Sequence, residues 1–216
     1  MKKILLFAIA VVAIAVVLMA QSQANIGNLS GTVVNNNTGT DGGSGCTPTA
    51  GTICANAFDG LGAGLQSLIL ISIASVPSAM VSTNTGLVTL NLSGAFTTPP
   101  SLTTNTALQA LYLEGNLSAS PNLSTNIGLA TLFLNTNAAL ASAPGLTTNV
   151  GLMTVNMSGD ALPAAQVNQV LADLVTCCLM NAGAVDLSGG TNAAPTGAGI
   201  TAAAALSMAG WTVITN

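Results

Sequence analysis

The residues able to do acid–base chemistry are few, and their types restrict what this chain can catalyse. The sequence of 216 residues contains no His and no Arg, and its only basic side chains are Lys2 and Lys3. No imidazole or guanidinium group is therefore present to activate a nucleophile or to hold a developing anion. The remaining catalytic option is a pair of carboxylic acids, drawn from Asp41, Asp59, Glu114, Asp160, Asp173 and Asp186.

The same lack of cations restricts the ligands. Both lysines precede an apolar run at 4–20, and Ser22 and Ala24 are small residues of the kind that precede a signal-peptidase cleavage site. We expect residues 1–24 to be a signal peptide, which predicts a secreted or cell-surface protein. Nucleic acid is excluded as a partner, because Lys and Arg supply most of the affinity for phosphates. The alternative is an uncleaved anchor, since the run approaches the roughly 20 residues that cross a bilayer. Membrane contact is expected only through this segment.

An internal repeat determines the predicted fold. Asn84, Asn105, Asn126 and Asn149 lie in four similar blocks, 21, 21 and 23 residues apart. Each block continues into LxxLxL, whose last apolar residues alternate as in a strand with one buried face. A single short strand cannot bury its apolar side, so the coils must stack around a common core with a parallel sheet. The apolar positions are Leu65, Leu68, Leu70, Leu87, Leu90, Leu92, Leu108, Leu111, Leu113, Leu129, Leu132, Leu134, Leu152, Val155 and Met157.

This pattern resembles the leucine-rich-repeat family, in particular short bacterial and phage-encoded repeats that read LSxNTAL followed by LxLxxN. The resemblance covers roughly residues 61–216 and implies an α/β solenoid, a leucine-rich-repeat coil stack with one parallel β-sheet. In this family a further Asn closes LxxLxLxxN, and its amide bonds to the backbone between coils. The matching positions are Asn116 and Asn137, with Asp160 as a replacement, whereas the coils of Ala95 and Ile73 are expected to lack this rung.

After the fourth coil the period changes to that of a helix, which Pro163 opens and which ends near Gly183. A strand is predicted at 184–188, a second helix at 199–208 and a closing strand at 211–214. These longer elements predict a helical C-terminal cap. The expected organisation is a signal peptide at 1–24, a flexible linker at 25–45, an N-terminal cap at 46–64, leucine-rich repeats at 65–160, and a last repeat with the C-terminal cap at 161–216.

Strand alternation places one residue of every coil at the centre of the solvent-facing, concave side of the sheet. This column brings Tyr112 and Phe133 together beside amides and a carboxylate. Exposed rings with polar neighbours are typical of contact sites for proteins or glycans; the alternative is a cross-strand stack that only stabilises the sheet. The predicted ligand-binding residues are Ile69, Asn91, Tyr112, Glu114, Phe133, Asn135, Asn156 and Asp186.

Ser, Thr and Asn also recur together at 82–84, 103–105, 124–126 and 147–149. The favoured interpretation is an internal ladder, in which hydroxyls and amides satisfy the backbone of tight turns. The alternative is a regular uncharged face that matches an ordered lattice such as ice.

The four cysteines form two pairs close in sequence. Cys46 and Cys54 enclose a short loop, which predicts a disulfide in an exported protein. Cys177 and Cys178 are adjacent, and because only Cys178 falls on the apolar stripe, core packing is favoured over a bridge between them. No metal and no cofactor are predicted, since without His a zinc site would need two adjacent cysteines on one helix.

These observations favour a noncatalytic protein. The predicted coils hold the acids of the repeat region apart, except Asp160 and Asp186 in neighbouring coils, and the spacing does not suit a hydrolytic pair. The preferred function is a secreted or surface-displayed binding or adhesion module, whose concave sheet contacts a protein or glycan on a cell or host surface. A structural surface or ice-binding protein is the second interpretation, and a carboxylate-dependent hydrolase is the third.

Overall fold

The computed structural model describes residues 66–73, 75 and 81–216, all within the compact unit Gly45–Asn216. The predictions for residues 1–65 lie outside the described residues, including the inward position of Leu65. They include the signal peptide, the linker, the N-terminal cap and the Cys46–Cys54 disulfide.

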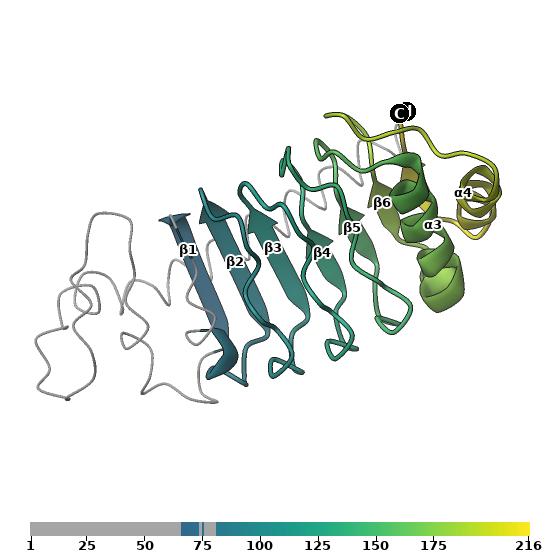
Figure 1. Cartoon of the computed structure of the whole chain (residues 1–216). Helices are drawn as coiled ribbons and strands as arrows, with labels where there is room; N and C mark the ends of the chain where they lie inside the picture. Colours follow the sequence, from purple (N-terminus) through teal and green to yellow (C-terminus); the bar gives the residue numbers. More distant parts are fainter. Residues whose placement is uncertain (1–65, 74, 76–80) are drawn as a thin grey trace, which may run out of the picture. The chain divides into compact units, whose positions relative to one another are not determined.

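The described chain forms a parallel β-solenoid with two α-helices near its C-terminal end (Figure 1). One strand comes from each coil, and the seven strands form a single sheet in chain order with all pairs parallel. The predicted stack of coils with one parallel sheet is therefore confirmed. The strands are β1 (Ser67–Ile73), β2 (Thr89–Gly94), β3 (Ala110–Glu114), β4 (Thr131–Phe133), β5 (Thr154–Asn156), β6 (Ala184–Asp186) and β7 (Thr212–Ile214).

The core consists of the leucines that the repeat pattern points inward. Leu90, Leu111 and Leu132 are paired in register on β2 to β4 and are fully buried, and Val155 and Val185 continue the line. Burial of the apolar area of each such side chain contributes about 2 kcal/mol to the free energy of folding. Stacking thus lets strands of three to seven residues share one continuous interior.

The two predicted C-terminal helices are confirmed. Helix α3 (Ala164–Cys178) follows Pro163 and buries Val167, Val170, Leu171, Leu174 and Cys178. A short 3-10 helix, η3 (Leu179–Asn181), then leads to β6, and α4 (Ala198–Met208) precedes β7. Within the described part of the chain, no helix combines the length and apolar character needed to cross a membrane.

A column of buried asparagines joins successive coils through their turns. The Asn105 amide nitrogen donates to the carbonyls of Val81 (3.0 Å) and Asn84 (2.8 Å) in the preceding coil. Asn126 and Asn149 repeat both bonds one and two coils later. The internal-ladder interpretation is therefore confirmed for the Asn column, because these amides satisfy carbonyls that would otherwise lie buried without a donor.

A second ladder follows the strands in the later coils. Asn137 Oδ1 accepts from the backbone N–H groups of Gly115 and Leu117, both at 3.0 Å, and its amide nitrogen donates to the Leu113 carbonyl at 2.9 Å. Asn192 makes the equivalent bonds to Leu162 N–H and the Met157 carbonyl, at 2.8 Å each. Sequence reasoning missed Asn192, which lies outside the LxxLxLxxN spacing.

Asn116 matches the family position, but its side chain is exposed and makes no such rung, so that expectation is wrong. The backbone explains the difference. Thr136 (φ 66°) and Gly159 (φ 77°) adopt left-handed conformations immediately before the inward-facing Asn137 and Asp160. Gly115, which precedes Asn116, has no positive φ, and the chain does not turn the next side chain inward.

Asp160 takes the rung between Asn137 and Asn192. Its Oδ1 accepts a hydrogen bond from the Asn137 N–H at 2.8 Å. The side-chain oxygens of Asn137 and Asn192 accept from backbone N–H groups in the same way. Its Oδ2 is buried and has no hydrogen-bond partner among the described residues. In the neighbouring rungs, the corresponding atom is an amide nitrogen that donates to backbone carbonyls. Only a protonated carboxyl can imitate that donor.

Burial raises the pKa of Asp160 to about 8, with the opposing Asn137 hydrogen bond as the smaller effect. The pKa of Asp160 is thus higher in the folded protein than in the unfolded chain. The protonated carboxyl contributes its full stability below about pH 4, and this contribution is lost progressively as the pH rises through about 8.

We expect Asp160→Asn to raise the free energy of unfolding at pH 7 by about 2 kcal/mol, with a larger gain at pH 9. Urea unfolding followed by circular dichroism at pH 5, 7 and 9 measures this. The control is Glu114→Gln on the exposed end of β3, and equal pH profiles for Asp160→Asn and the wild type would contradict the assignment.

Candidate ligand-binding face

The predicted middle column is present as one row across the sheet. The register aligns Ile69 with Asn91, Asn91 with Tyr112, and Tyr112 with Phe133. The row continues through Asn156 and Asp186, and ends at Ile214, which sequence reasoning left out of the face. Except for the exposed Ile214, these side chains are half-buried, whereas their neighbours on each strand point into the core. The predicted outward orientation is thus confirmed.

Tyr112 and Phe133 form the centre of this row. Their ring centroids are 5.1 Å apart and the ring planes are tilted by 31°. The cross-strand stack is therefore present, and burial raises the pKa of the Tyr112 hydroxyl. Both rings remain partly accessible to solvent, so the stack leaves aromatic surface available to a ligand.

Amides and hydroxyls flank the ring pair. Asn91 lies beside Tyr112 and makes no side-chain hydrogen bond to any described residue. On the other side, Asn156 Oδ1 accepts from the Ser158 N–H at 2.9 Å, which fixes the loop after β5. Thr89, Thr131 and Thr154 are half-buried at the first position of their strands. The face therefore offers neutral donors and acceptors on both sides of an apolar centre.

The other predicted ligand-binding residues differ in accessibility. Glu114 is exposed at the end of β3. Asp186 Oδ1 accepts from Ser188 N–H and from the Ser188 hydroxyl, at 2.9 and 2.7 Å. Asn135 follows β4, and its Oδ1 is shielded from solvent without a donor among the described residues. Of these three residues, Glu114 is the one best placed to reach a ligand.

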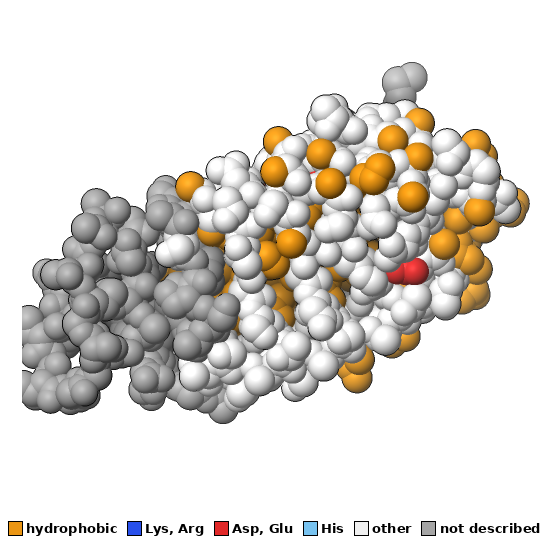
Figure 2. All heavy atoms as spheres, in the orientation of Figure 1, with side chains coloured by type: hydrophobic (Ala, Val, Ile, Leu, Met, Phe, Trp, Pro, Cys, Tyr) orange, Lys and Arg blue, Asp and Glu red, His pale blue; other side chains and the backbone are white. Residues whose placement is uncertain are grey.

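The acids of the repeat region do not meet at one surface. Asp160 is fully buried in the ladder, whereas Asp186 belongs to the solvent-facing row. The described residues hold no group of three or more His, Cys, Asp or Glu side chains suited to a metal ion. In the space-filling view, the part of the surface that belongs to described residues is white and orange, with little red and no blue (Figure 2).

Cys177 and Cys178 form a disulfide with each other, which corrects the expectation of core packing without a bridge. Cys178 is also buried in the core, so packing and bridge occur together. Adjacent side chains on a regular helix point about 100° apart and cannot be bridged. Cys178 leaves the helical region (φ −137°, ψ 10°), and this break at the end of α3, invisible in the apolar spacing, brings the two sulfurs together.

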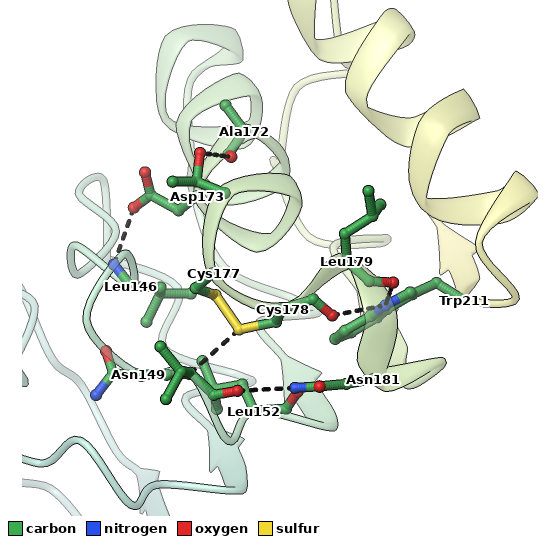
Figure 3. The surroundings of a disulfide bond; sticks show 12 residues. Leu146, Asn149, Leu152, Ala172, Asp173, Cys177, Cys178, Leu179, Asn181 and Trp211 are labelled. Carbon is green, nitrogen blue, oxygen red and sulfur yellow. Dashed lines mark hydrogen bonds between the residues drawn. A yellow bond between two sulfur atoms is a disulfide. The ribbon is translucent and has the colours of Figure 1, made fainter.

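The disulfide lies where the first Asn ladder ends (Figure 3). Cys178 Sγ is 3.2 Å from the carbonyl oxygen of Asn149, the oxygen to which a further ladder amide would donate. The ring nitrogen of Trp211 donates to the Cys178 and Leu179 carbonyls at 3.3 and 3.2 Å. These contacts tie the last two coils to the end of the repeat array.

A bridge between adjacent residues closes the smallest possible loop, so it adds little through chain entropy. We therefore expect Cys177→Ala to lower the free energy of unfolding by about 1 kcal/mol or less, and Cys178→Ala by about 2 kcal/mol, because the second also opens a cavity in the core. Urea unfolding followed by the fluorescence of Trp211, the only tryptophan of the chain, compares the two. Equal losses would show that the bridge, and not the packing of Cys178, provides the stability.

Comparison with known proteins gives no match to a family model, a curated protein or a solved structure. The function must therefore be inferred from the chemistry of the sheet face.

Proposed function

We propose that this protein is a noncatalytic binding or adhesion module, which presents the solvent-facing side of its sheet to a protein or glycan on a cell or host surface. The observation that supports this is the in-register row Asn91, Tyr112, Phe133 and Asn156. It places a stacked aromatic pair between two amides on a rigid sheet. Such rings give a large contact area at little entropic cost, and the amides give direction to hydrogen bonds.

The ligand in this proposal is uncharged or weakly charged at the contact. The whole sequence has two basic residues, Lys2 and Lys3, and neither lies in the repeat region. An acidic polymer would find no cation on the sheet, which also argues against nucleic acid. Neutral hydroxyl, amide and apolar groups suit the Thr, Asn and aromatic side chains of the face.

Three finer interpretations belong to the same proposal. The first is membership of the leucine-rich-repeat family, supported by the LxxLxL spacing and the Asn ladders. The second is a terminal cap formed by α3 and α4, supported by their burial of the last part of the core. The third is export by the N-terminal segment 1–24, supported by two lysines and an apolar run before Ser22 and Ala24.

Replacing both rings tests the binding face. We expect Tyr112→Ser with Phe133→Ser to weaken binding to the ligand by at least about 100-fold, because hot-spot aromatics carry most of the affinity. The free energy of unfolding should fall by about 3 kcal/mol for the lost half-burial of two rings and their contact, which leaves the solenoid folded. The measurement is binding of the purified protein to glycan and cell-surface protein arrays, followed by titration of each hit. Ile127→Ser with Val150→Ser is the matched control, since both side chains are 60% exposed on the turns. Unchanged affinity in the ring variant would overturn the proposed face.

A second candidate function, binding to an ordered lattice such as ice, is favoured by one observation. Thr83, Thr104, Thr125 and Thr148 occupy the same turn position in four successive coils and are all exposed. The Thr104 hydroxyl donates to the Ser82 carbonyl of the preceding coil at 2.7 Å. The neighbouring Asn column is internal, so the hydroxyls and methyl groups of this Thr row form a repeating, uncharged surface.

Lattice binding would produce thermal hysteresis near the freezing point in a solution of the purified protein. Thr125→Tyr with Thr148→Tyr should abolish the hysteresis by interrupting the row, whereas the variant lacking both sheet aromatics should retain it. A freezing point equal to the melting point would remove this second candidate.

A further inference from the structure

The last helix is apolar on two opposite sides. Gly199, Ala202 and Leu206 of α4 are buried, and a Cβ at Gly199 would lie 1.9 Å from Oδ1 of Asn168 on α3. On the opposite side, Ile200, Ala204 and Met208 follow one another at intervals of four residues and form one line along the helix. Ile200 is 58% and Met208 is 85% exposed. Orange side chains gather at this end of the chain in Figure 2.

Among the described residues, the strand that follows α4 is the last of the sheet, and its outer edge has no partner strand. Thr212 N–H donates to the Gly183 carbonyl at 2.9 Å, and the Ile214 carbonyl accepts from Leu187 N–H at 2.8 Å. Because bonds alternate along a strand, the N–H and C=O groups of Val213 point away from β6. Ile214 is 46% exposed beside this edge, and β7 pairs with no strand other than β6 among the described residues.

These two features are what a coil inside the stack presents to the next coil. A strand edge is extended by the next strand, and an apolar wall is covered by the next turn or helix. A terminal repeat that ends an array carries a polar outer side. The outer side of α4 instead carries the apolar line Ile200, Ala204 and Met208, flanked by the exposed hydroxyl residues Thr201 and Ser207. Helices α3 and α4 cover the core of the preceding coils, but the outer side of α4 and β7 still presents a strand edge and an apolar line that a further partner can cover.

We propose that two copies of this chain associate end to end through their last coils, with β7 pairing antiparallel to β7 of the second copy and α4 against α4. In this arrangement the two Val213 residues face each other and exchange both backbone hydrogen bonds. A two-fold axis perpendicular to the sheet keeps both α4 helices on the same side, and the small Ala204 at the middle of the exposed line permits close approach.

A second copy fits this end better than other occupants do. An extended peptide would pair with Val213 but leave the line from Ile200 to Met208 uncovered. A lipid surface would cover that line, but it offers no strand to the edge. A second copy supplies both a strand and an apolar helix. The acids of the described residues, Glu114, Asp160, Asp173 and Asp186, lie outside α4 and β7, so the two copies bring no like charges together.

Sedimentation velocity of the full chain over a range of concentrations tests the proposal. We expect the wild type to be a dimer, and Ala204→Glu to raise its dissociation constant by about 100-fold or more, because the two-fold places the new carboxylates near each other. Ala172→Glu is the matched control, since it makes the same change at an exposed position of α3. It should leave the dimer intact.

A second variant addresses the strand edge separately. Val213→Pro removes the outward N–H but none of the bonds to β6, and it should weaken the dimer while the circular dichroism spectrum stays that of the wild type. A wild type that remains monomeric at about 100 µM, a dimer that survives Ala204→Glu, or assembly into open-ended polymers would each overturn the proposal.

Discussion

The fold depends on asparagine side chains that reach from one coil to the one before. Strands β4, β5 and β6 have only three residues each, so the sheet alone provides few bonds per coil. The turns add a buried amide that donates to two carbonyls of the preceding coil at every step from Asn105 to Asn149. Since an unpaired buried carbonyl costs about 1–3 kcal/mol, the ladder makes any slip between coils unfavourable and holds the leucines in register.

The same constraint creates the candidate ligand-binding face. Because each coil is fixed to its neighbour, one strand position forms a straight row across the sheet, from Ile69 to Ile214. The residue types in that row can then differ from coil to coil without disturbing the core, because their side chains point to solvent. Placing Tyr112 next to Phe133 concentrates the aromatic surface on two central strands, where the neighbouring coils hold it rigid.

Much of this was predictable because the deciding signals are periodic. The inward leucines, the parallel strands, the buried Asn column and the outward row all follow from alternation and from the 21-residue spacing. The errors occur where one backbone conformation decides the outcome. Asn116 points outward because Gly115 is not left-handed, whereas Thr136 is, although it is a β-branched residue that seldom adopts φ 66°. The bridge between Cys177 and Cys178 likewise depends on one non-helical residue at the end of α3.

The scarcity of charge connects the ladder, the face and the open end of the stack. Asp160 is buried, so the described surface carries three acids and no base. It has little electrostatic means of attracting or repelling partners. Recognition must then arise from apolar area and neutral hydrogen bonds, both of which are short-ranged and insensitive to salt. Without charge repulsion, copies of this protein avoid self-association only where Ser, Thr and Asn side chains cover the surface and hydrate it. The turns of the regular coils carry these residues alongside the exposed Ile127 and Val150, and α4 and β7 expose Ile200, Met208 and Ile214. No acid lies on α4 or β7, so the charge distribution does not oppose contact there.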